Sequence, residues 1–348
     1  MDPLTHSAFG VVCALAVSGK QARLSHVALA GLSGGLLPDA DIFLTSDADP
    51  LFNIEYHRHF SHSFFLAPIV GAVAAGIAWT LLKLFRAVPD FRSLVLPAII
   101  AVMGHIFCDL WTSYGTRVAW PLSDARASLH WISVVDPILT LPLIALVIAA
   151  LVKRSRRMVM LSLLWVTLYL SFCLVQKQRA NAFMDSWLAQ QSGTPAEWRN
   201  VVKPSFANVI VWRALAFRDG VLHVFAIRCG VGTPQLIPGT TAPMFHDAEE
   251  ARKYFRLDPA TSQARDIRRF HHFSDGWLGI HPDDPNLLSD LRYAALPNEV
   301  APMWGIRMKP DKPDATIDWV SGASLQNRPW SRLWGMITGS DLAAPPRP

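Results

Sequence analysis

Four apolar stretches, each close to twenty residues long, constrain this chain more than any other feature. They cover residues 64–82, 94–112, 134–152 and 158–175. The only charged or histidine side chains within them are His105, Asp109 and Asp136. A helix needs about 20 predominantly apolar residues to cross a hydrocarbon core of about 30 Å. The stretches therefore predict membrane-spanning helices.

Two shorter apolar runs, residues 7–19 and 25–37, precede them. By length alone such runs fit short spans, re-entrant segments or buried helices. Charged residues make up only 17% of the chain, against about 25% in ordinary soluble domains. The chain opens on Met1-Asp2-Pro3 without a basic region, so we expect the first run to be retained rather than cleaved as a signal peptide.

Lys and Arg cluster in three places between these runs, at residues 20–23, 83–92 and 153–157. Short loops rich in Lys and Arg stay on the cytoplasmic side. If all three face inside, the two short runs cross as a pair, six segments result and both termini lie outside. We therefore expect a multi-pass membrane protein, in contact with the lipid bilayer, with its C-terminal domain on the outer side.

The character of the chain changes after residue 179, and residues 203–348 contain no run long enough to span a membrane. Residues 209–217 and 221–228 flank Asp219-Gly220, which is typical of a β-hairpin turn. Further strands are expected at 277–280, 291–296 and 303–308, and helices at 247–255 and 261–270.

The predicted fold class is an α-helical polytopic membrane bundle of about six segments, followed by a C-terminal α+β, mainly antiparallel domain. Residues 1–178 form the membrane-embedded domain and residues 179–202 a linker helix. Residues 203–340 form the extramembrane domain, and residues 341–348 a disordered tail.

Histidine and aspartate residues gather at one end of the apolar runs. Six of them are the expected metal ligands, namely His6, Asp39, His57, His62, His105 and Asp109. Imidazole and carboxylate are ligands of divalent ions such as Zn²⁺, and ionisable side chains at the edge of the hydrocarbon layer are costly. His105 and Asp109 are four apart on a predicted helix, so both can face one metal.

Most of these residues also have a structural explanation. His105 and Asp109 fit a helix-end histidine hydrogen-bonded to an acid one turn away. Asp39 and Asp41 fit a turn after a proline, and Asp136 fits the N-cap of a helix that starts with proline.

Other polar residues near the apolar runs carry weaker signals. Ser61 is expected to cap a helix that begins at His62, and Thr5 to cap the first helix. His130 and Asp124 share a loop with the motifs and are weaker candidates. The remaining histidines of the polar domain are expected to be surface or core residues, with two of them adjacent on a strand; they are His223, His246, His271, His272 and His281.

Composition excludes two other classes of site. The four cysteines contain no CxxC pair, which excludes a zinc ribbon or thioredoxin-like motif. The net charge of +5 arises from loop residues rather than a basic patch interleaved with aromatics. We expect no nucleic-acid partner.

Four motifs in order, within about residues 1–175, resemble one known family. They are Leu4-Thr5-His6, Leu37-Pro38-Asp39-Ala40-Asp41, His57-Arg58 with Ser61-His62-Ser63, and Gly104-His105 through Asp109 to Gly115. This pattern resembles the YdjM-like family of predicted inner-membrane metal-dependent hydrolases. The resemblance implies a protein of the bacterial inner membrane, so that the outer C-terminal domain would lie in the periplasm. It also implies a distant similarity to zinc-dependent phospholipase C and the P1-type nucleases. His59 and His130 depart from the pattern, standing where the family tends to have Gly and Asp.

Together these observations predict a metal-dependent hydrolase, with zinc the expected cofactor and a phosphoester or lipid-like substrate at the outer membrane face. A divalent ion would lower the pKa of a bound water, with Asp41 or Asp136 orienting it. Arg58 would neutralise a phosphoryl oxygen. The alternative is a non-enzymatic membrane protein, either an ion or proton relay or a scaffold for the C-terminal domain.

Overall fold

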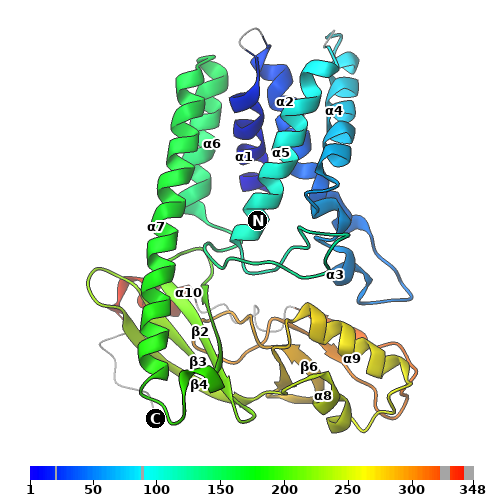
Figure 1. Ribbon diagram of the computed structural model, residues 1–348, viewed down its shortest axis with the longest axis vertical. Helices are drawn as coiled ribbons and strands as arrows, with labels where there is room; N and C mark the ends of the chain where they lie inside the picture. The colour runs from blue at the N-terminus through cyan, green and yellow to red at the C-terminus, as the bar shows by residue number, and fades with distance from the viewer. Residues whose placement is uncertain (20–21, 88–89, 322–329, 341–348) are drawn as a thin grey trace. The chain divides into compact units, whose positions relative to one another are not determined.

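The computed structural model describes residues 1–19, 22–87, 90–321 and 330–340. The chain divides into two units (Figure 1). The first unit comprises Met1–Leu44, Tyr56–Leu174 and Phe206–Asn208, and the second comprises Thr45–Glu55, Val175–Ser205 and Val209–Pro348. The predicted tail, residues 341–348, lies outside the described residues.

The first unit is helical, and each apolar run of the sequence forms a helix in it. The helices are α1 (Pro3–Val17), α2 (Leu24–Leu36), α4 (Ala67–Leu84), α5 (Arg92–Trp111), α6 (Pro137–Val152) and the first part of α7 (Arg156–Leu188). Helix α1 packs against α2, α5 and α6, and α2 also packs against α4 and α5. In Figure 1 these helices run side by side.

Three helices, α4, α5 and α7, are long and apolar enough to cross a membrane. Helices α1, α2 and α6 have 15, 13 and 16 residues. At about 1.5 Å per residue they reach about 20–24 Å, short of the ~30 Å of a hydrocarbon core. Helix α7 continues past its apolar part to Leu188, so the predicted linker helix is the end of α7.

Two aspartates cap helices of this unit. Asp2, rather than the predicted Thr5, caps α1, because its carboxylate accepts hydrogen bonds from the N–H groups of Leu4 and Thr5. Asp136 caps α6 in the same way, accepting from two N–H groups of the first turn. Asp and Pro together start both helices because the acid satisfies free N–H groups and proline presets the helical φ.

Glycines let α2 approach its neighbours closely. A Cβ added at Gly35 would lie 2.4 Å from the backbone oxygen of His6 in α1. One added at Gly34 would lie 2.6 Å from the backbone oxygen of Ala98 in α5. Small residues at such contacts are the usual means of close helix packing in membranes. The close approach of α2 to α1 and to α5 therefore depends on Gly35 and Gly34.

Three of the connections between helices lie at the same end of the first unit (Figure 1). Arg156, the first residue of α7, donates hydrogen bonds to the backbone oxygens of Ser18 and Gly19 at 3.0 and 2.6 Å, so the start of α7 and the α1–α2 connection lie together. Figure 1 places the α4–α5 connection at the same end of the unit. The three predicted basic clusters thus share one end, except that Lys20 lies outside the described residues.

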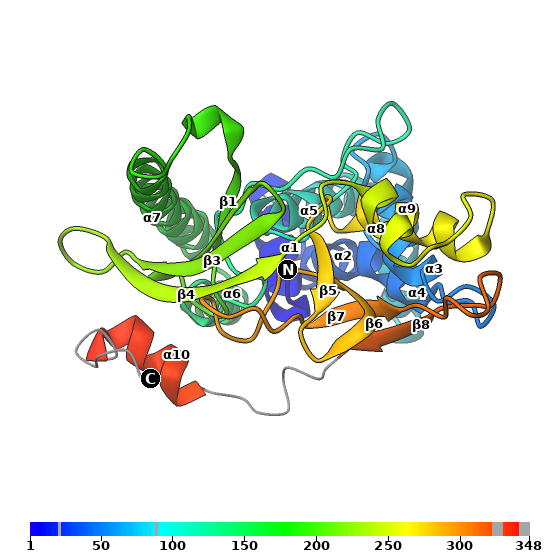
Figure 2. The same cartoon turned by 90° about the horizontal axis from the view of Figure 1, so that it is seen from below.

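The second unit contains two antiparallel four-stranded sheets, as the α+β prediction requires. The first sheet has the order β1 (Arg199–Pro204), β2 (Val211–Arg218), β3 (Val221–Arg228), β4 (Gln235–Pro243). The second has the order β5 (Leu278–His281), β6 (Asp284–Asp290), β7 (Trp304–Arg307), β8 (Asp318–Ser321). Helices α8 (Ala248–Tyr254), α9 (Ser262–Phe273) and α10 (Trp330–Thr338) complete it (Figure 2).

The predicted hairpin is confirmed, because β2 and β3 pair antiparallel across Asp219 and Gly220, both at positive φ. The predicted strand at 291–296 is wrong, since β6 ends at Asp290. His271 and His272 lie in α9 and not on a strand. Helix α9 has an apolar stripe at helical spacing, which the short sequence window around the two histidines does not reveal.

We predict that Gly35→Ala disrupts the first unit, because the new methyl group overlaps a backbone oxygen that cannot rotate away. We expect a loss of about 1–3 kcal/mol in stability, measured as a lower melting temperature of the detergent-solubilised protein. Gly76→Ala in α4 is the matched control, since a Cβ there meets nothing within 4 Å. Equal melting temperatures for the two variants would show that the close approach of α1 and α2 is not required.

Candidate metal centre

Four segments of the first unit bring their polar residues to one cluster. Helix α1 contributes His6, and the 3₁₀ helix η1 (Leu37–Phe43) contributes Asp39. The short 3₁₀ turn η2 (Phe60–His62) contributes His62, and α5 contributes His105 and Asp109. The predicted sharing of one face by His105 and Asp109 is what places both in the cluster.

Two carboxylates face three imidazoles across short distances. Asp109 lies 3.1 Å from Nε2 of His6, 3.1 Å from Nε2 of His62 and 3.6 Å from Nε2 of His105. Asp39 lies 3.8, 3.4 and 3.6 Å from the same three nitrogens. All three histidines and Asp109 are buried, and Asp39 is partly exposed. The cluster is therefore open to its surroundings only on the Asp39 side.

Hydrogen bonds fix which nitrogen of two histidines can bind a metal. His105 Nδ1 lies 2.7 Å from the backbone oxygen of Gly35. A carbonyl can only accept, so Nδ1 carries the proton and Nε2 presents its lone pair to the cluster. His62 Nδ1 faces Asp41 at 3.2 Å, and its Nε2 likewise faces the cluster. This arrangement is the one that orients imidazole ligands in metal sites.

The cluster lacks the positive charge that its own atoms require. The Nε2 atoms of His62 and His105 lie 3.0 Å apart. One oxygen each of Asp39 and Asp109 is buried without a hydrogen-bond partner. Lone pairs and unpaired carboxylate oxygens at such separations repel unless a proton or a cation lies among them. Single atoms of His6, Asp39, His105 and Asp109 lie within 4.8 Å of one another, so the donor set fits a divalent metal.

The pKa of His62 reflects the same requirement for positive charge in the cluster. Burial lowers the pKa of His62, but its hydrogen bonds to Asp109, Asp39 and Asp41 outweigh burial and raise that pKa to about 10. Metal ligands must be deprotonated to bind. A proton on His62 and a divalent cation are thus alternative ways of balancing these carboxylates.

Asp41 forms a further set of hydrogen bonds beside the cluster. Its carboxylate lies 2.7 Å from Nδ1 of His57 and accepts hydrogen bonds from the backbone N–H of Arg58 and the hydroxyl of Ser61. Burial alone would raise the pKa of Asp41, but its hydrogen bonds to His57 and His62 hold that pKa below the usual range. Ser61 therefore serves Asp41 and does not cap α4, which begins only at Ala67.

Arg58 is bound inside the site rather than facing outward. Its guanidinium lies 3.0 Å from Asp109, donates to the hydroxyl of Thr112 and lies 4.8 Å from the ring centre of Tyr114. Its φ of 61° is in the left-handed region, which is costly for a non-glycine residue. The amino group of Met1 also forms an ion pair with Asp109.

The remaining candidates lie apart from the cluster's contacts. Asp136 accepts hydrogen bonds from the N–H groups that it caps and from the hydroxyl of Tyr169. The ring of His59 lies tilted against that of Trp120, with the ring centroids 5.3 Å apart, and His130 Nε2 lies 3.2 Å from the hydroxyl of Ser128. Asp124 is exposed.

Three contributors to the site have no signal in the sequence that would single them out. The Gly35 carbonyl orients His105, the Ser61 hydroxyl holds Asp41, and Tyr114 packs against both Arg58 and His57. Ser61 and Tyr114 do stand within the motifs that contain His62 and Asp109, and that proximity is the one hint of their roles.

The segment that joins the two ligand motifs is clamped by an arginine. Residues 45–55 connect the Asp39–Asp41 motif to His57, and they belong to the second unit. Arg269 of α9 lies 2.7 Å from Asp49 and donates to Glu55 at 2.9 Å. Its hydrogen bonds and charge lower the pKa of Asp49. Arg269 thus holds residues 45–55 in place within the second unit.

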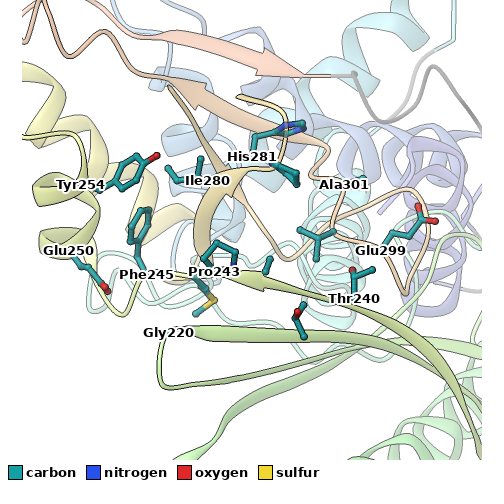
Figure 3. Close-up of a pocket in the computed structure, with 15 residues that line it drawn as sticks. Gly220, Thr240, Pro243, Phe245, Glu250, Tyr254, Ile280, His281, Glu299 and Ala301 are labelled. Atoms are coloured by element: carbon teal, nitrogen blue, oxygen red, sulfur yellow. The ribbon is translucent and has the colours of Figure 1, made fainter. Parts of the chain in front are cut away.

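A separate pocket of about 850 Å³ lies within the second unit (Figure 3). Strand β4, helix α8, strand β5 and residues 299–301 line it. Its walls are largely apolar, with Phe245 and Tyr254 among them, and its charged lining residues are Glu250 and Glu299. The sequence does not predict this pocket, because its walls come from segments far apart in the chain.

The first unit, with its apolar helices and a polar cluster at one end, is typical of a membrane protein. Comparison with known proteins is consistent with this, since the profile of the family described as "YdjM inner membrane protein" matches residues 1–180. The chain belongs to this family, which confirms the resemblance read from the motifs and places the protein in the inner membrane.

The chain is also 32% identical over 147 residues to the uncharacterized protein YfhP of Bacillus subtilis. That match covers 39% of this chain and 42% of the relative, so the chain spans less than half of the relative's length. No solved structure matches. The descriptions of the family and of the relative name no reaction, so the hydrolase activity and the likeness to phospholipase C remain predictions.

We predict that Arg269→Gln loosens residues 45–55, because it removes the cation that binds both Asp49 and Glu55 of this segment. Charge-assisted hydrogen bonds are worth about 1.5–3 kcal/mol each, so we expect amide hydrogen exchange in this segment to quicken at least tenfold. Exchange measured by mass spectrometry on the detergent-solubilised protein tests this.

Arg307→Gln is the matched control for this experiment, since Arg307 pairs with Asp284 on the second sheet. Its exchange in residues 45–55 should equal that of the wild type. Unchanged exchange in Arg269→Gln would mean that packing, and not the ion pairs, holds the segment.

Proposed function

We propose that this protein is a membrane-bound metal-dependent hydrolase whose metal ligands are His6, Asp39, His62, His105 and Asp109. The convergence of imidazole Nε2 atoms on two buried, unpaired carboxylate oxygens is the observation that supports it most. Zinc is the first candidate because its usual ligands are these residue types.

The chemistry of such a site would suit the hydrolysis of several kinds of ester or amide bond. A divalent cation bound there supplies a Lewis acid that activates water and polarises a phosphoryl or carbonyl oxygen. Among the protein's own groups, Asp41 orients both His57 and His62 through their Nδ1 atoms. That leaves Nε2 of His57 able to accept a proton. We therefore assign His57 to proton transfer or to a second metal, and Asp41 to its orientation.

Arg58 and Asp136 take different roles from those first expected. Arg58 is committed to Asp109, so it balances the charge of a metal ligand and fixes its orientation. Asp136 is occupied by the N-terminus of α6 and by Tyr169, and we assign it no step of the reaction.

We further propose that six segments lie in the membrane, with the three basic connections in the cytoplasm and the metal centre at the outer face. Helices α1, α2 and α6 are short for a full span, which fits segments that end at a polar site rather than beyond the bilayer. A site at this level favours a lipid-like or phosphoester substrate delivered from the membrane.

We predict that His105→Ala abolishes both zinc retention and hydrolysis, because it removes a ligand. Asp41→Asn should retain zinc with about 10–100-fold weaker affinity, since Asp41 orients ligands without being required to bind. Excess zinc should therefore restore occupancy in Asp41→Asn and not in His105→Ala. Metal analysis of the purified protein, and hydrolysis of phospho-, carboxy- and amide-ester substrates in micelles, measure these outcomes.

His26→Ala is the control, because His26 lies in the first turn of α2, at the end of the helices opposite the cluster. It should keep both zinc and activity. Activity that survives chelation, or that His105→Ala leaves intact, would exclude the metallohydrolase and favour the relay or scaffold alternative.

We predict that a reporter fused after Gln191, just beyond α7, lies in the periplasm. Alkaline phosphatase at this point should be active and a fluorescent protein that folds only in the cytoplasm should be dark. A fusion at Ser155, in the α6–α7 connection, should give the reverse pattern. Bright fluorescence after Gln191 would reverse the proposed orientation.

A further inference from the structure

Arg117 is a buried arginine that has no counter-ion. Only 6% of its surface is exposed, and its Nε is buried without a hydrogen-bond partner. Within the described ranges, residues 1–19, 22–87, 90–321 and 330–340, its side chain forms no ion pair. Buried charges in proteins are normally paired, because an unpaired one loses its hydration without compensation. An anion that is not part of the chain would supply the missing partner.

The backbone of Arg117 lies against the candidate metal centre. Its N–H donates to the backbone oxygen of Arg58 at 3.1 Å, and the N–H of Phe64 donates to the backbone oxygen of Val118 at 3.0 Å. Residues 116–118 therefore run along the segment that contains His62. Arg58 itself has a buried Nε without a partner, although its other nitrogens are bound.

Arg126 lies on the segment that pairs with residues 116–118, because Thr116 and Ala127 exchange backbone hydrogen bonds. Its guanidinium donates to the backbone oxygens of Tyr114 and Gly115. Arg126 and Arg58 lie 5.2 and 4.8 Å from the ring centre of Tyr114, and the same ring contacts His57. Asp124 is the one acid in residues 112–133, and it is exposed. Residues 112–133 thus contain two arginines, Arg117 and Arg126, against one exposed acid, so the segment beside the candidate metal centre is cationic.

We propose that Arg117, with Arg58 and Arg126, forms a subsite for the phosphate group of a substrate beside the metal centre. Guanidinium groups recognise phosphate through paired N–H donors. Several guanidinium groups around one site suit a tetrahedral dianion better than a planar carboxylate, which a single arginine satisfies. The pocket of Figure 3 does not suit such a ligand, because its charged lining residues are both glutamates.

This subsite deepens the proposed hydrolase by naming the group that its substrate carries. It does not require the metal, because the guanidinium groups are charged and in place without it. Phosphate binding to the metal-free protein therefore tests the subsite, while zinc binding tests the proposed function. The proposed subsite and the proposed function can therefore fail separately.

The experiment is a calorimetric titration of inorganic phosphate into the chelator-treated, detergent-solubilised protein. We expect the wild type to bind phosphate and Arg117→Gln to bind at least tenfold more weakly, since one charge-assisted contact is lost. Zinc affinity should change less than twofold in Arg117→Gln. Phosphate should raise the melting temperature of the wild type and not that of the variant.

Arg157→Gln is the control, since Arg157 is exposed in the first turn of α7 at the other end of the helices. Arg117→Lys, which keeps the charge but not the paired donors, should bind with intermediate affinity and guards against a folding defect in the glutamine variant. Succinate, a dicarboxylate, should bind weakly. Equal affinity of the wild type and Arg117→Gln for phosphate, or equal binding of succinate and phosphate, would overturn the proposal.

A second titration distinguishes the source of the phosphate group. Nanodiscs containing phosphatidic acid should displace phosphate if the group belongs to a lipid, whereas phosphatidylcholine nanodiscs should not. Displacement by a soluble phosphomonoester alone would assign the subsite to a water-soluble substrate.

Discussion

The hydrogen bond from His105 to the backbone oxygen of Gly35 is the contact on which the rest of the site depends. It joins α5 to α2 and fixes the tautomer of a histidine of the candidate metal centre. It also explains why position 35 has no side chain, because α2 must lie close enough to α1 to place His6 beside the same ring. One backbone carbonyl thus couples helix packing to ligand orientation, and an apolar bundle acquires a polar end without loss of close packing.

Much of the fold follows from patterns of short range. Charge-free runs predict the helices, and Asp219-Gly220 predicts the hairpin, because each signal arises within one element. The errors lie where an element is set by its neighbours. Residues 291–296 are strand-like apart from Arg292, but the pairing of β6 ends at Asp290, and a short mostly apolar run does not reveal a pairing partner.

The same distinction holds for the candidate site: features within one helix can be predicted from the sequence, and contacts between distant segments cannot. His105 and Asp109 are four residues apart on one helix, so their shared face is readable from the sequence. The contribution of Ser61 to Asp41 spans 20 residues across a loop and depends on the path of that loop, which no local pattern encodes. Asp136 shows the reverse case, where a conspicuous acid is explained by the helix that it starts and by Tyr169 on α7.

His6 and Asp109 are 103 residues apart, and this separation has a consequence for biosynthesis. At about 5–20 residues per second, the ribosome needs on the order of 5–20 s to supply the aspartate after the histidine. When α1 and α2 are made, the α5 residues that His6 and Asp39 contact do not yet exist. The nascent bundle must therefore keep His6 and Asp39 hydrated until α5 arrives. Burial of the cluster is consequently a late event in assembly.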